Sequence, residues 1–380
     1  MKRCKNSSSQ HVLKQRGKEI AQNHDILYLG SNIYKVPSQS KTGKYYDVMF
    51  NSGGWKCMCP YHTHGKRQCK HILAVRYVIN SKKPKDKKQN VTIIVPDVQC
   101  PNCHSNDFKK RGMRPNKTIP VQRYSCKKCG RYFTHRPGFN GKHYSPEIIT
   151  EVLYLHAMAV LPTRIVEFLQ EKNGFSMTRT TIFRWIKEYG DLLLKFQKKY
   201  TIVGDVWHTD EIYFTVNGSG RLLFGVMDAS TRFIISYDIS KTKFGYDATS
   251  LFKKAMEYAG KYPDMLISDG LGGFKTGYKK AMYTRTKPRT THVADVGIRN
   301  RHPANNIYER FNGEVRDRIA RVRGFKSEHP ALIDLIVIYH NFVRQHAGIG
   351  NITPAKAGGI TIEGKNKWRT MIEHAALFCA

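Results

Sequence analysis

The chain has 380 residues, enough for two or three domains with hydrophobic cores. Its 64 lysines and arginines outnumber its 29 acidic residues and leave a formal charge of +35, far more than solubility requires, which indicates a nucleic-acid partner. Residues 1–144 hold 30 basic and 6 acidic side chains, so we expect the main electrostatic contact there. No run of about 20 apolar residues and no signal peptide occur, which predicts a cytoplasmic, nucleoid-associated protein without a membrane partner.

Seven of the nine cysteines fall in two tight clusters, a distribution that in a cytoplasmic chain favours metal binding over disulfides. The first cluster has the spacing C-x-C-x9-C-x-H and consists of Cys57, Cys59, Cys69 and His71. Three thiolates and one imidazole suit a closed, structural zinc site. The pattern resembles the SWIM zinc finger, so we assign residues 1–80 to a SWIM-type module. His62 and His64 are competing ligands inside the loop.

Residues 81–95 are rich in lysine and predict a basic linker. Residues 96–140 then contain two C-x-x-C knuckles 22 residues apart, which predict a zinc ribbon with a second structural Zn2+ bound by Cys100, Cys103, Cys126 and Cys129. Between the knuckles lie Lys109, Lys110 and Arg111, which we expect to bind DNA phosphates. A ribbon that mediates protein contacts is the alternative.

Residues 141–199 predict three short helices. Ser145 is the expected N-cap of the first, the second lies near 163–171, and the third covers about 178–189. The arrangement resembles a helix-turn-helix, whose third helix enters the major groove. The side chains expected to contact DNA are Arg179, Thr180, Arg184 and Lys187. A helical bundle without DNA contact has the same periodicity.

From residue 200 onward, β-forming residues predominate. Strands are expected at 203–216, 221–227 and 232–239, followed by a helix at 246–258 and a strand at 265–268. This order is the core of a ribonuclease H-like α/β fold, a mixed sheet with flanking helices. Asp210 then lies within the first strand and Asp269 at the end of the last.

Several motifs make a resemblance specific: HTDE at 208–211, GVMDASTR at 225–232, ISDG at 267–270, NIYERFN at 306–312, RGF at 323–325 and YHNFVRQH at 339–346. Together they resemble the DDE transposases of prokaryotic insertion sequences, relatives of retroviral integrases. The resemblance covers roughly residues 200–360, the expected catalytic domain, and leaves 361–380 as a C-terminal tail.

The resemblance implies that Asp210, Asp269 and Glu309 hold two Mg2+ or Mn2+ ions for phosphoryl transfer. Arg316, seven residues after Glu309 and on the same helical face, is expected to bind DNA. The 39 residues between Asp269 and Glu309 exceed the family's common spacing, and we place the excess in a loop around 285–299. Glu314 is the rival for the glutamate, whereas Glu211 and Asp228 are expected to be structural.

The implied function is a transposase that binds double-stranded DNA at element ends, cleaves it, and joins the freed 3′-hydroxyl to target DNA. Joining two ends to one target implies a homodimer or a higher assembly on DNA. Two alternatives stay open: a transposase-derived DNA-binding regulator without catalysis, and a ribonuclease H-like nuclease or resolvase.

Overall fold

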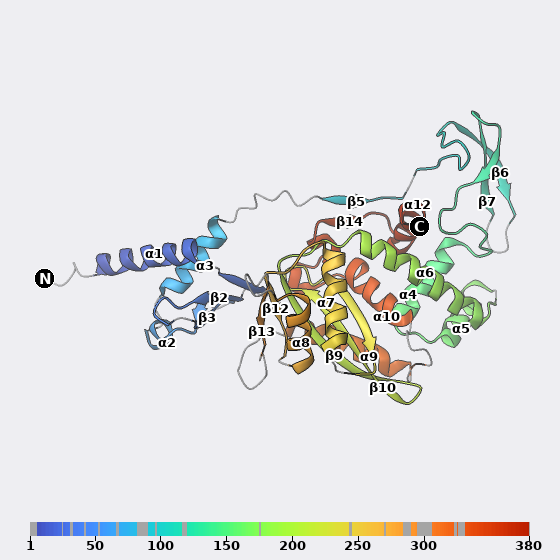
Figure 1. Ribbon diagram of the computed structural model, residues 1–380. Helices are drawn as coiled ribbons and strands as arrows, with labels where there is room; N and C mark the ends of the chain where they lie inside the picture. The colour runs from blue at the N-terminus through green and yellow to red at the C-terminus, as the bar shows by residue number, and fades with distance from the viewer. Residues whose placement is uncertain are drawn as a thin grey trace.

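The computed structural model describes residues 6–24, 26–30, 33–41, 43–51, 54–65, 68–81, 90–95, 97–115, 120–174, 176–242, 245–269, 271–283, 290–294, 306–322, 325 and 331–379. Residues 82–89 of the expected linker, and 285–289 and 295–299 of the expected loop, lie outside them. None of the helices in the described ranges is long and apolar enough to cross a membrane. A module at the N-terminal end and a small ribbon flank the central sheet (Figure 1).

The N-terminal module is a four-stranded sheet in the order β1-β2-β3-β4 with helices packed on it. Its elements are α1 (Asn6–Asn23), β1 (Leu27–Gly30), β2 (Ile33–Pro37), β3 (Tyr45–Asn51), β4 (Gly54–Cys57), α2 (Pro60–Gly65) and α3 (Lys70–Ser81). The small apolar core contains Ile20, Val36 and Val48 together with the three cysteines of the first cluster. The cluster is therefore part of the core of this module.

The ribbon is a three-stranded antiparallel sheet of β6 (Phe108–Arg114), β7 (Val121–Cys126) and β8 (Tyr132–Thr134). Its core is limited to a few side chains around the second cysteine cluster, including Phe133. The register shifts between Lys110 and Met113, where Gly112 has a φ of +72° that favours glycine. So small a core needs a further source of stability, which a metal bound by the four cysteines would supply.

The three helices expected at 141–199 are α4 (Pro146–Ala157), α5 (Pro162–Asn173) and α6 (Arg179–Lys199). Ser145 caps α4 by accepting a hydrogen bond from the backbone N–H of Ile148, as expected. The predicted end of the third helix at residue 189 is wrong, since α6 continues through Gly190 to Lys199. The extra turns bury Leu193 and Phe196, and this packing outweighs the low helix propensity of glycine.

The central sheet has the order β11-β10-β9-β12-β13, formed by β9 (Val206–Val216), β10 (Ser219–Asp228), β11 (Ile234–Ser240), β12 (Met265–Ile267) and β13 (Thr291–Val293). The first three strands pair antiparallel, whereas β12 pairs parallel with both β9 and β13. This mixed order is that of a ribonuclease H-like fold, which confirms the predicted fold class. The sequence did not predict β13.

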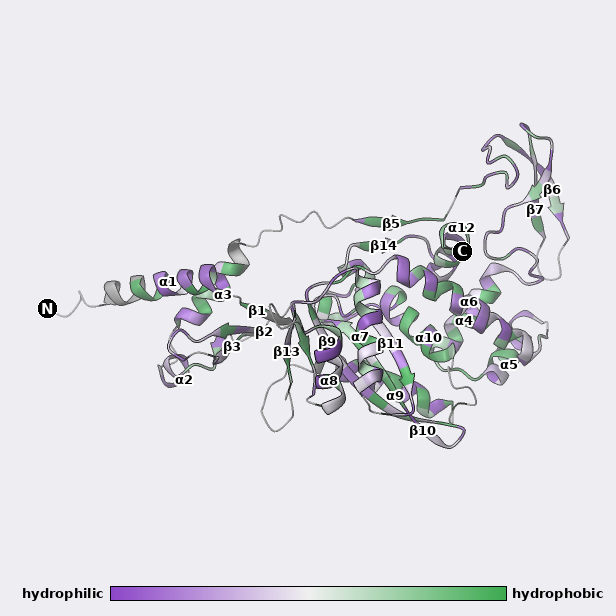
Figure 2. Cartoon of the chain, viewed as in Figure 1, coloured by the Kyte–Doolittle hydropathy of each residue, from purple (hydrophilic) through white to green (hydrophobic). Residues whose placement is uncertain are grey.

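Helices cover both faces of this sheet. On one face, α7 (Gly245–Ala259) and α8 (Gly272–Ala281) bury Trp207, Phe224 and Leu266. On the other, α9 (Asn306–Arg321) and α10 (Ala331–Ile338) bury Ile212 and Phe214. Figure 2 shows α10 as predominantly hydrophobic, in agreement with the burial of most of its residues. Alternate residues of β9 thus enter different cores, which determines the direction of each acidic side chain on that strand.

The C-terminal residues differ from the expected tail. After η3 (Tyr339–Val343), η4 (Ala347–Ile349) and α11 (Pro354–Ala357), residues 360–378 form β14 (Ile360–Ile362) and α12 (Lys367–Phe378). Strand β14 pairs parallel with β5 (Val91–Ile93), a strand within the expected linker. Helix α12 buries Trp368, Met371 and Ile372 in the same core as α4 and α6. Strand β14 is therefore held by its pairing with β5, and α12 by its packing on α4 and α6.

Replacing Met371 by alanine should lower the free energy of unfolding by about 2–5 kcal/mol, because it leaves a cavity in this core. Leu377→Ala on the same helix is the control, since that side chain is 50% exposed and its loss should cost roughly 0.5 kcal/mol or less. Chemical unfolding followed by tryptophan fluorescence measures both changes. Equal effects of the two substitutions would show that α12 is not docked.

Candidate functional site

Asp210 lies in the middle of β9 on the face that α9 covers. It pairs with Gly225 of β10, and the backbone N–H of Glu211 donates to its Oδ1 at 2.9 Å. The side chain of Asn312 on α9 donates to Oδ2 at 2.8 Å. The carboxylate is therefore partly buried and held from two elements that are far apart in the sequence.

Asp269 follows β12, and the parallel pairing of that strand brings it to Asp210. Ile267 pairs with His208, and Asp269 and Asp210 each come two residues after these paired residues. The exposed Asp269 accepts a hydrogen bond from the backbone N–H of Leu271 at 3.1 Å, just before α8. One carboxylate oxygen each of Asp210, Asp269 and Glu211 lie within 4.8 Å of one another.

Glu309 occupies the first turn of α9. It precedes Asn312 by three residues, so the two share the helix face that contacts Asp210. Its side chain is exposed and is not part of the 4.8 Å group, but its charge acts on Asp210. Glu309 therefore lies near Asp210, and its exposed side chain has the freedom to turn toward a ligand bound there.

The pKa of Asp210 reflects this crowding. Burial raises the pKa to about 7, the hydrogen bond from the backbone of Glu211 opposes the rise, and the carboxylates of Glu211, Asp269 and Glu309 add to it. Within the described part of the chain, no lysine or arginine forms an ion pair with either aspartate or with Glu309. A set of oxygen donors whose negative charges repel one another suits Mg2+ or Mn2+.

Glu314, the rival glutamate, faces elsewhere. It forms ion pairs with Arg344 and, at 3.7 Å, with Arg318, on a side of α9 that borders η3 and not β9. The carboxylate of Asp228 is occupied in the turn after β10, where it accepts from the backbone N–H of Thr231 at 2.8 Å and from neighbouring groups. These two acids therefore have structural partners, as expected for Asp228.

Glu211 has a different position from the one we expected. The alternation along β9 predicts that Glu211 faces away from Asp210, yet its carboxylate lies in one group with those of Asp210 and Asp269, at the level where β12 ends. The period of two along β9 did not reveal that the neighbouring strand stops at this level.

Two further residues complete the site and were missed from the sequence. Asn312 is buried, and its Oδ1 has no hydrogen-bond partner among the described residues. Tyr308 is fully buried, and its hydroxyl lies over Gly225, where any Cβ would come within 1.9 Å of it. Glycine at 225 thus permits the close approach of α9 to β10. Tyr308 lies one residue before Glu309 and Asn312 three residues after it. This helical spacing could have predicted that both lie near the site.

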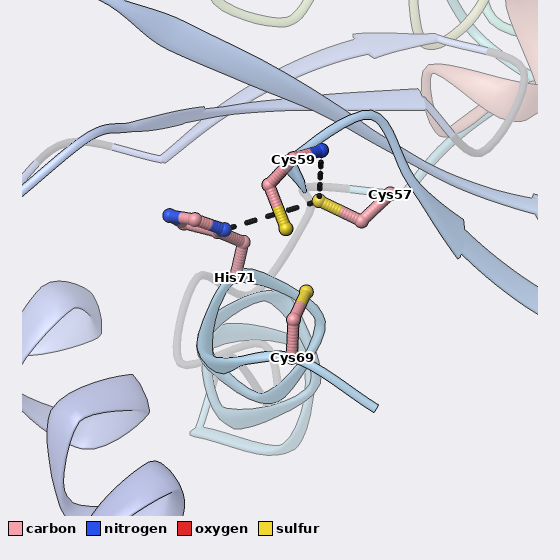
Figure 3. Close-up of side chains that lie close together, drawn as sticks. All are labelled: Cys57, Cys59, Cys69 and His71. Atoms are coloured by element: carbon pink, nitrogen blue, oxygen red, sulfur yellow. Dashed lines mark hydrogen bonds between the residues drawn. The ribbon is translucent and has the colours of Figure 1, made fainter. Parts of the chain in front are cut away.

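The four residues of the first cluster converge as predicted. Figure 3 shows Cys57 and Cys59 at the end of β4 facing Cys69 and His71 at the start of α3. All four are buried, and their ligand atoms lie within 4.8 Å of one another. The Sγ of Cys57 lies 3.9 Å from Nδ1 of His71. His62 and His64 lie outside this group.

The ribbon cluster has a similar geometry. The Sγ atoms of Cys100 and Cys129 are 3.6 Å apart, and those of Cys103 and Cys126 are 3.5 Å apart. These separations are too long for disulfides and near the edge of about 3.8 Å of a tetrahedron with zinc–sulfur bonds of about 2.3 Å. Both donor sets therefore fit a closed zinc site, and the assignment of the first cluster to the SWIM type stays a prediction.

The residues predicted to bind DNA are all exposed: Arg179, Thr180, Arg184 and Lys187 on α6, Lys109, Lys110 and Arg111 on β6, and Arg316 on α9. Phe183 also projects from α6 and is 56% exposed. In the ribbon, the guanidinium of Arg123 stacks on the ring of Tyr132, 5.2 Å from its centroid. Both surfaces thus combine cations with an aromatic side chain.

Comparison with known proteins identifies relatives. Residues 204–346, which include both aspartates and Glu309, match the profile of a protein family described as DDE domain. The transposase for insertion sequence-like element IS431mec of Staphylococcus aureus is 22% identical over 202 residues, covering 53% of this chain and 87% of that protein. The Staphylococcus aureus transposase for insertion sequence element IS257 in transposon Tn4003 has the same identity and coverage.

Solved structures that align with part of this chain include the HTLV-2 integrase catalytic core domain in complex with magnesium. It has 14% identity and a TM-score of 0.31 and covers 42% of this chain and 99% of that chain. The simian T-cell lymphotropic virus intasome in complex with PP2A regulatory subunit B56 gamma aligns at 13% identity and a TM-score of 0.33. The alignment covers 55% of this chain and 74% of that chain.

The two cysteine clusters predict two zinc ions per chain, measurable by atomic emission on dialysed protein. Cys69→Ser and Cys126→Ser should each reduce the content by one ion, because each removes one of four ligands. Cys379→Ser is the control, since Cys379 lies outside both clusters. Retention of both ions by either cluster variant would refute the corresponding site.

The raised pKa of Asp210 predicts a pH-dependent stability in buffer without Mg2+ or Mn2+. Between the ordinary value of 3.8 and the folded value of about 7, the folded protein holds one proton more than the unfolded chain. The free energy of unfolding of the wild type should therefore fall, relative to Asp210→Asn, by roughly 1.4 kcal/mol per pH unit across this window and level off above it. Urea unfolding from pH 4.5 to 8.5 measures the difference, and a constant difference contradicts the assignment.

Proposed function

Because the chain is a DDE transposase of the insertion-sequence type, we propose that it binds the ends of a DNA element, cleaves one strand there, and joins the freed end to target DNA. The observation that carries the proposal is that Asp210 of β9 and Asp269 after β12 meet in one acidic group, with Glu309 of α9 close enough for its charge to raise the pKa of Asp210. Such a site acts on phosphodiesters without a cofactor other than divalent metal.

Asp210, Asp269 and Glu309 would hold two Mg2+ or Mn2+ ions. Divalent cations at such a site activate the attacking oxygen and stabilise the leaving oxygen of a phosphodiester. Hydrolysis by water would free a 3′-hydroxyl, and attack of that hydroxyl on target DNA exchanges one phosphodiester for another. No ATP is required, since the number of phosphodiester bonds is conserved in the second step.

The surrounding residues orient the carboxylates. Asn312 donates to one oxygen of Asp210 and the backbone of Glu211 donates to the other, which limits rotation of this side chain. Tyr308 fixes the distance of α9 from β10 and thereby places Glu309. Arg316, exposed two turns farther along α9, would contact the DNA strand that enters the site.

Binding of the element ends would fall to α6 and the ribbon. The exposed face of α6 presents Arg179, Arg184 and Lys187 beside Phe183, which suits a helix that contacts phosphates and base edges in the major groove. The exposed basic side chains of β6 would hold phosphates next to it. Zinc in both clusters would stabilise the modules that carry or adjoin these surfaces.

Assembly on DNA follows from the chemistry. Two element ends are joined to one target, and the described residues of one chain form a single acidic group of this kind, so two copies or more would be needed to process both ends. The transposase relatives support a DNA-bound assembly of this kind.

The direct test incubates the purified protein with Mg2+ or Mn2+, a plasmid, and a labelled duplex carrying the DNA that flanks its own reading frame. Nicking at one defined position followed by joining of that end to the plasmid would support the proposal. Specific binding of the duplex without metal-dependent cleavage would favour a DNA-binding regulator, and cleavage of branched DNA without end specificity would favour a nuclease.

Glu309→Gln should reduce cleavage and joining by at least about 100-fold, because it removes a metal ligand. Its effect on duplex binding should be small, since most of the side chains proposed to bind the duplex lie on α6 and β6. Glu314→Gln is the matched control on the same helix and should retain most of the activity. A larger loss with Glu314→Gln than with Glu309→Gln would exchange their roles.

Arg184→Ala should weaken binding of the terminal duplex by about 1–3 kcal/mol, provided that Arg184 contacts a base edge. Lys195→Ala, also exposed on α6 but more than two turns farther along, should have little effect. Fluorescence anisotropy at fixed salt compares terminal and unrelated duplexes. Equal weakening for both duplexes would assign Arg184 to phosphate contact alone.

A further inference from the structure

The hairpin of β1 and β2 has two apolar faces. On one, Ile26, Tyr34 and Val36 pack in the core that contains the first cysteine cluster. On the other, Leu27 and Ile33 pack against the central sheet. Successive side chains of a strand point to opposite faces, which is how Ile33 and Tyr34 enter different cores. The hairpin thus packs between the rest of the N-terminal module and the central sheet, and Figure 1 shows it directed at β12 and β13.

The surface that the hairpin covers belongs to β12. Met265 and Ile267 are 0% exposed and point away from α7 and α8, whereas Leu266 between them enters the core beneath those helices. As far as the described residues extend, the apolar cluster around Met265 and Ile267 is completed by the hairpin and by the adjacent strands. The core beneath α9 and α10 contains no described residue of β12.

The position of β12 matters because Asp269 comes two residues after its last residue. The strand has only three residues, as does its outer neighbour β13, so few backbone hydrogen bonds hold it in the sheet. Packing on both faces has to supply the rigidity that a metal site needs. One of those faces is covered by the hairpin.

We propose that the N-terminal module is an integral support of the catalytic sheet, in which Leu27 and Ile33 are positioning residues that hold β12 and thereby Asp269. The proposal rests on the catalytic role proposed for Asp269. Because a small module of this kind depends on its metal for folding, zinc in the first cluster controls the support. A chain whose first cluster is empty would still bind DNA through α6 and the ribbon but would lack a correctly placed Asp269.

Amide hydrogen exchange of the full-length chain tests the support independently of catalysis. Cys69→Ser should raise exchange in β12 and β13 by about tenfold or more and leave β10 unchanged. Cys126→Ser, which empties the ribbon cluster, is the matched control and should leave β12 as in the wild type. Unchanged exchange of β12 in Cys69→Ser would overturn the proposal.

Substitution in the hairpin tests positioning. Ile33→Ser should raise the Mg2+ concentration for half-maximal cleavage several-fold, with duplex affinity unchanged, and Ile33→Val should restore it. Leu27→Ala provides a milder variant if Ile33→Ser loses zinc, and Val12→Ser, on an exposed position of α1, is the control. Increased exchange of β12 with a wild-type Mg2+ requirement would uphold the support and contradict the role of Asp269. Wild-type values for both would overturn the support.

Discussion

Mutual repulsion among carboxylates is the constraint that the catalytic domain has to meet. Asp210, Asp269 and Glu211 are held within 4.8 Å of one another, and Glu309 is close enough to raise the pKa of Asp210 further. Left to itself, such a group would separate or take up protons. The rest of the sheet domain keeps the carboxylates together, and the raised pKa of Asp210 reflects the repulsion that remains.

The helices and strands around the acidic group counteract the repulsion among its carboxylates. The ladder of β9 and β10 fixes Asp210, the contact of Tyr308 with Gly225 seats α9, and Asn312 reaches across to the carboxylate. Strand β12 is the weakest of these supports, since it has three residues and one neighbour of the same length. Burial of its Met265 and Ile267 beneath the N-terminal hairpin compensates for this.

The structural features that sequence alone predicted are those with local signals. Alternating β-formers gave β9 to β11, cysteine spacing gave both clusters, and Ser145 gave the start of α4. The parts it missed depend on contacts distant in the chain. The docking of α12, the pairing of β14 with β5, and the hairpin on β12 bring together segments more than 160 residues apart, and no local pattern encodes such pairs.

The acidic site shows the same division. Motif spacing placed Asp210 in a strand, Asp269 after a strand and Glu309 on a helix, as in the structure. It did not place Glu211 in the acidic group, because the sequence of β9 does not show where β12 ends. Anomalous diffraction from a Mn2+-loaded complex with terminal DNA would identify the side chains that bind the metal. We expect Mn2+ held by Asp210, Asp269 and Glu309, with Glu309 turned inward. Mn2+ held by Asp210, Asp269 and Glu211, with Glu309 still facing solvent, would contradict this expectation.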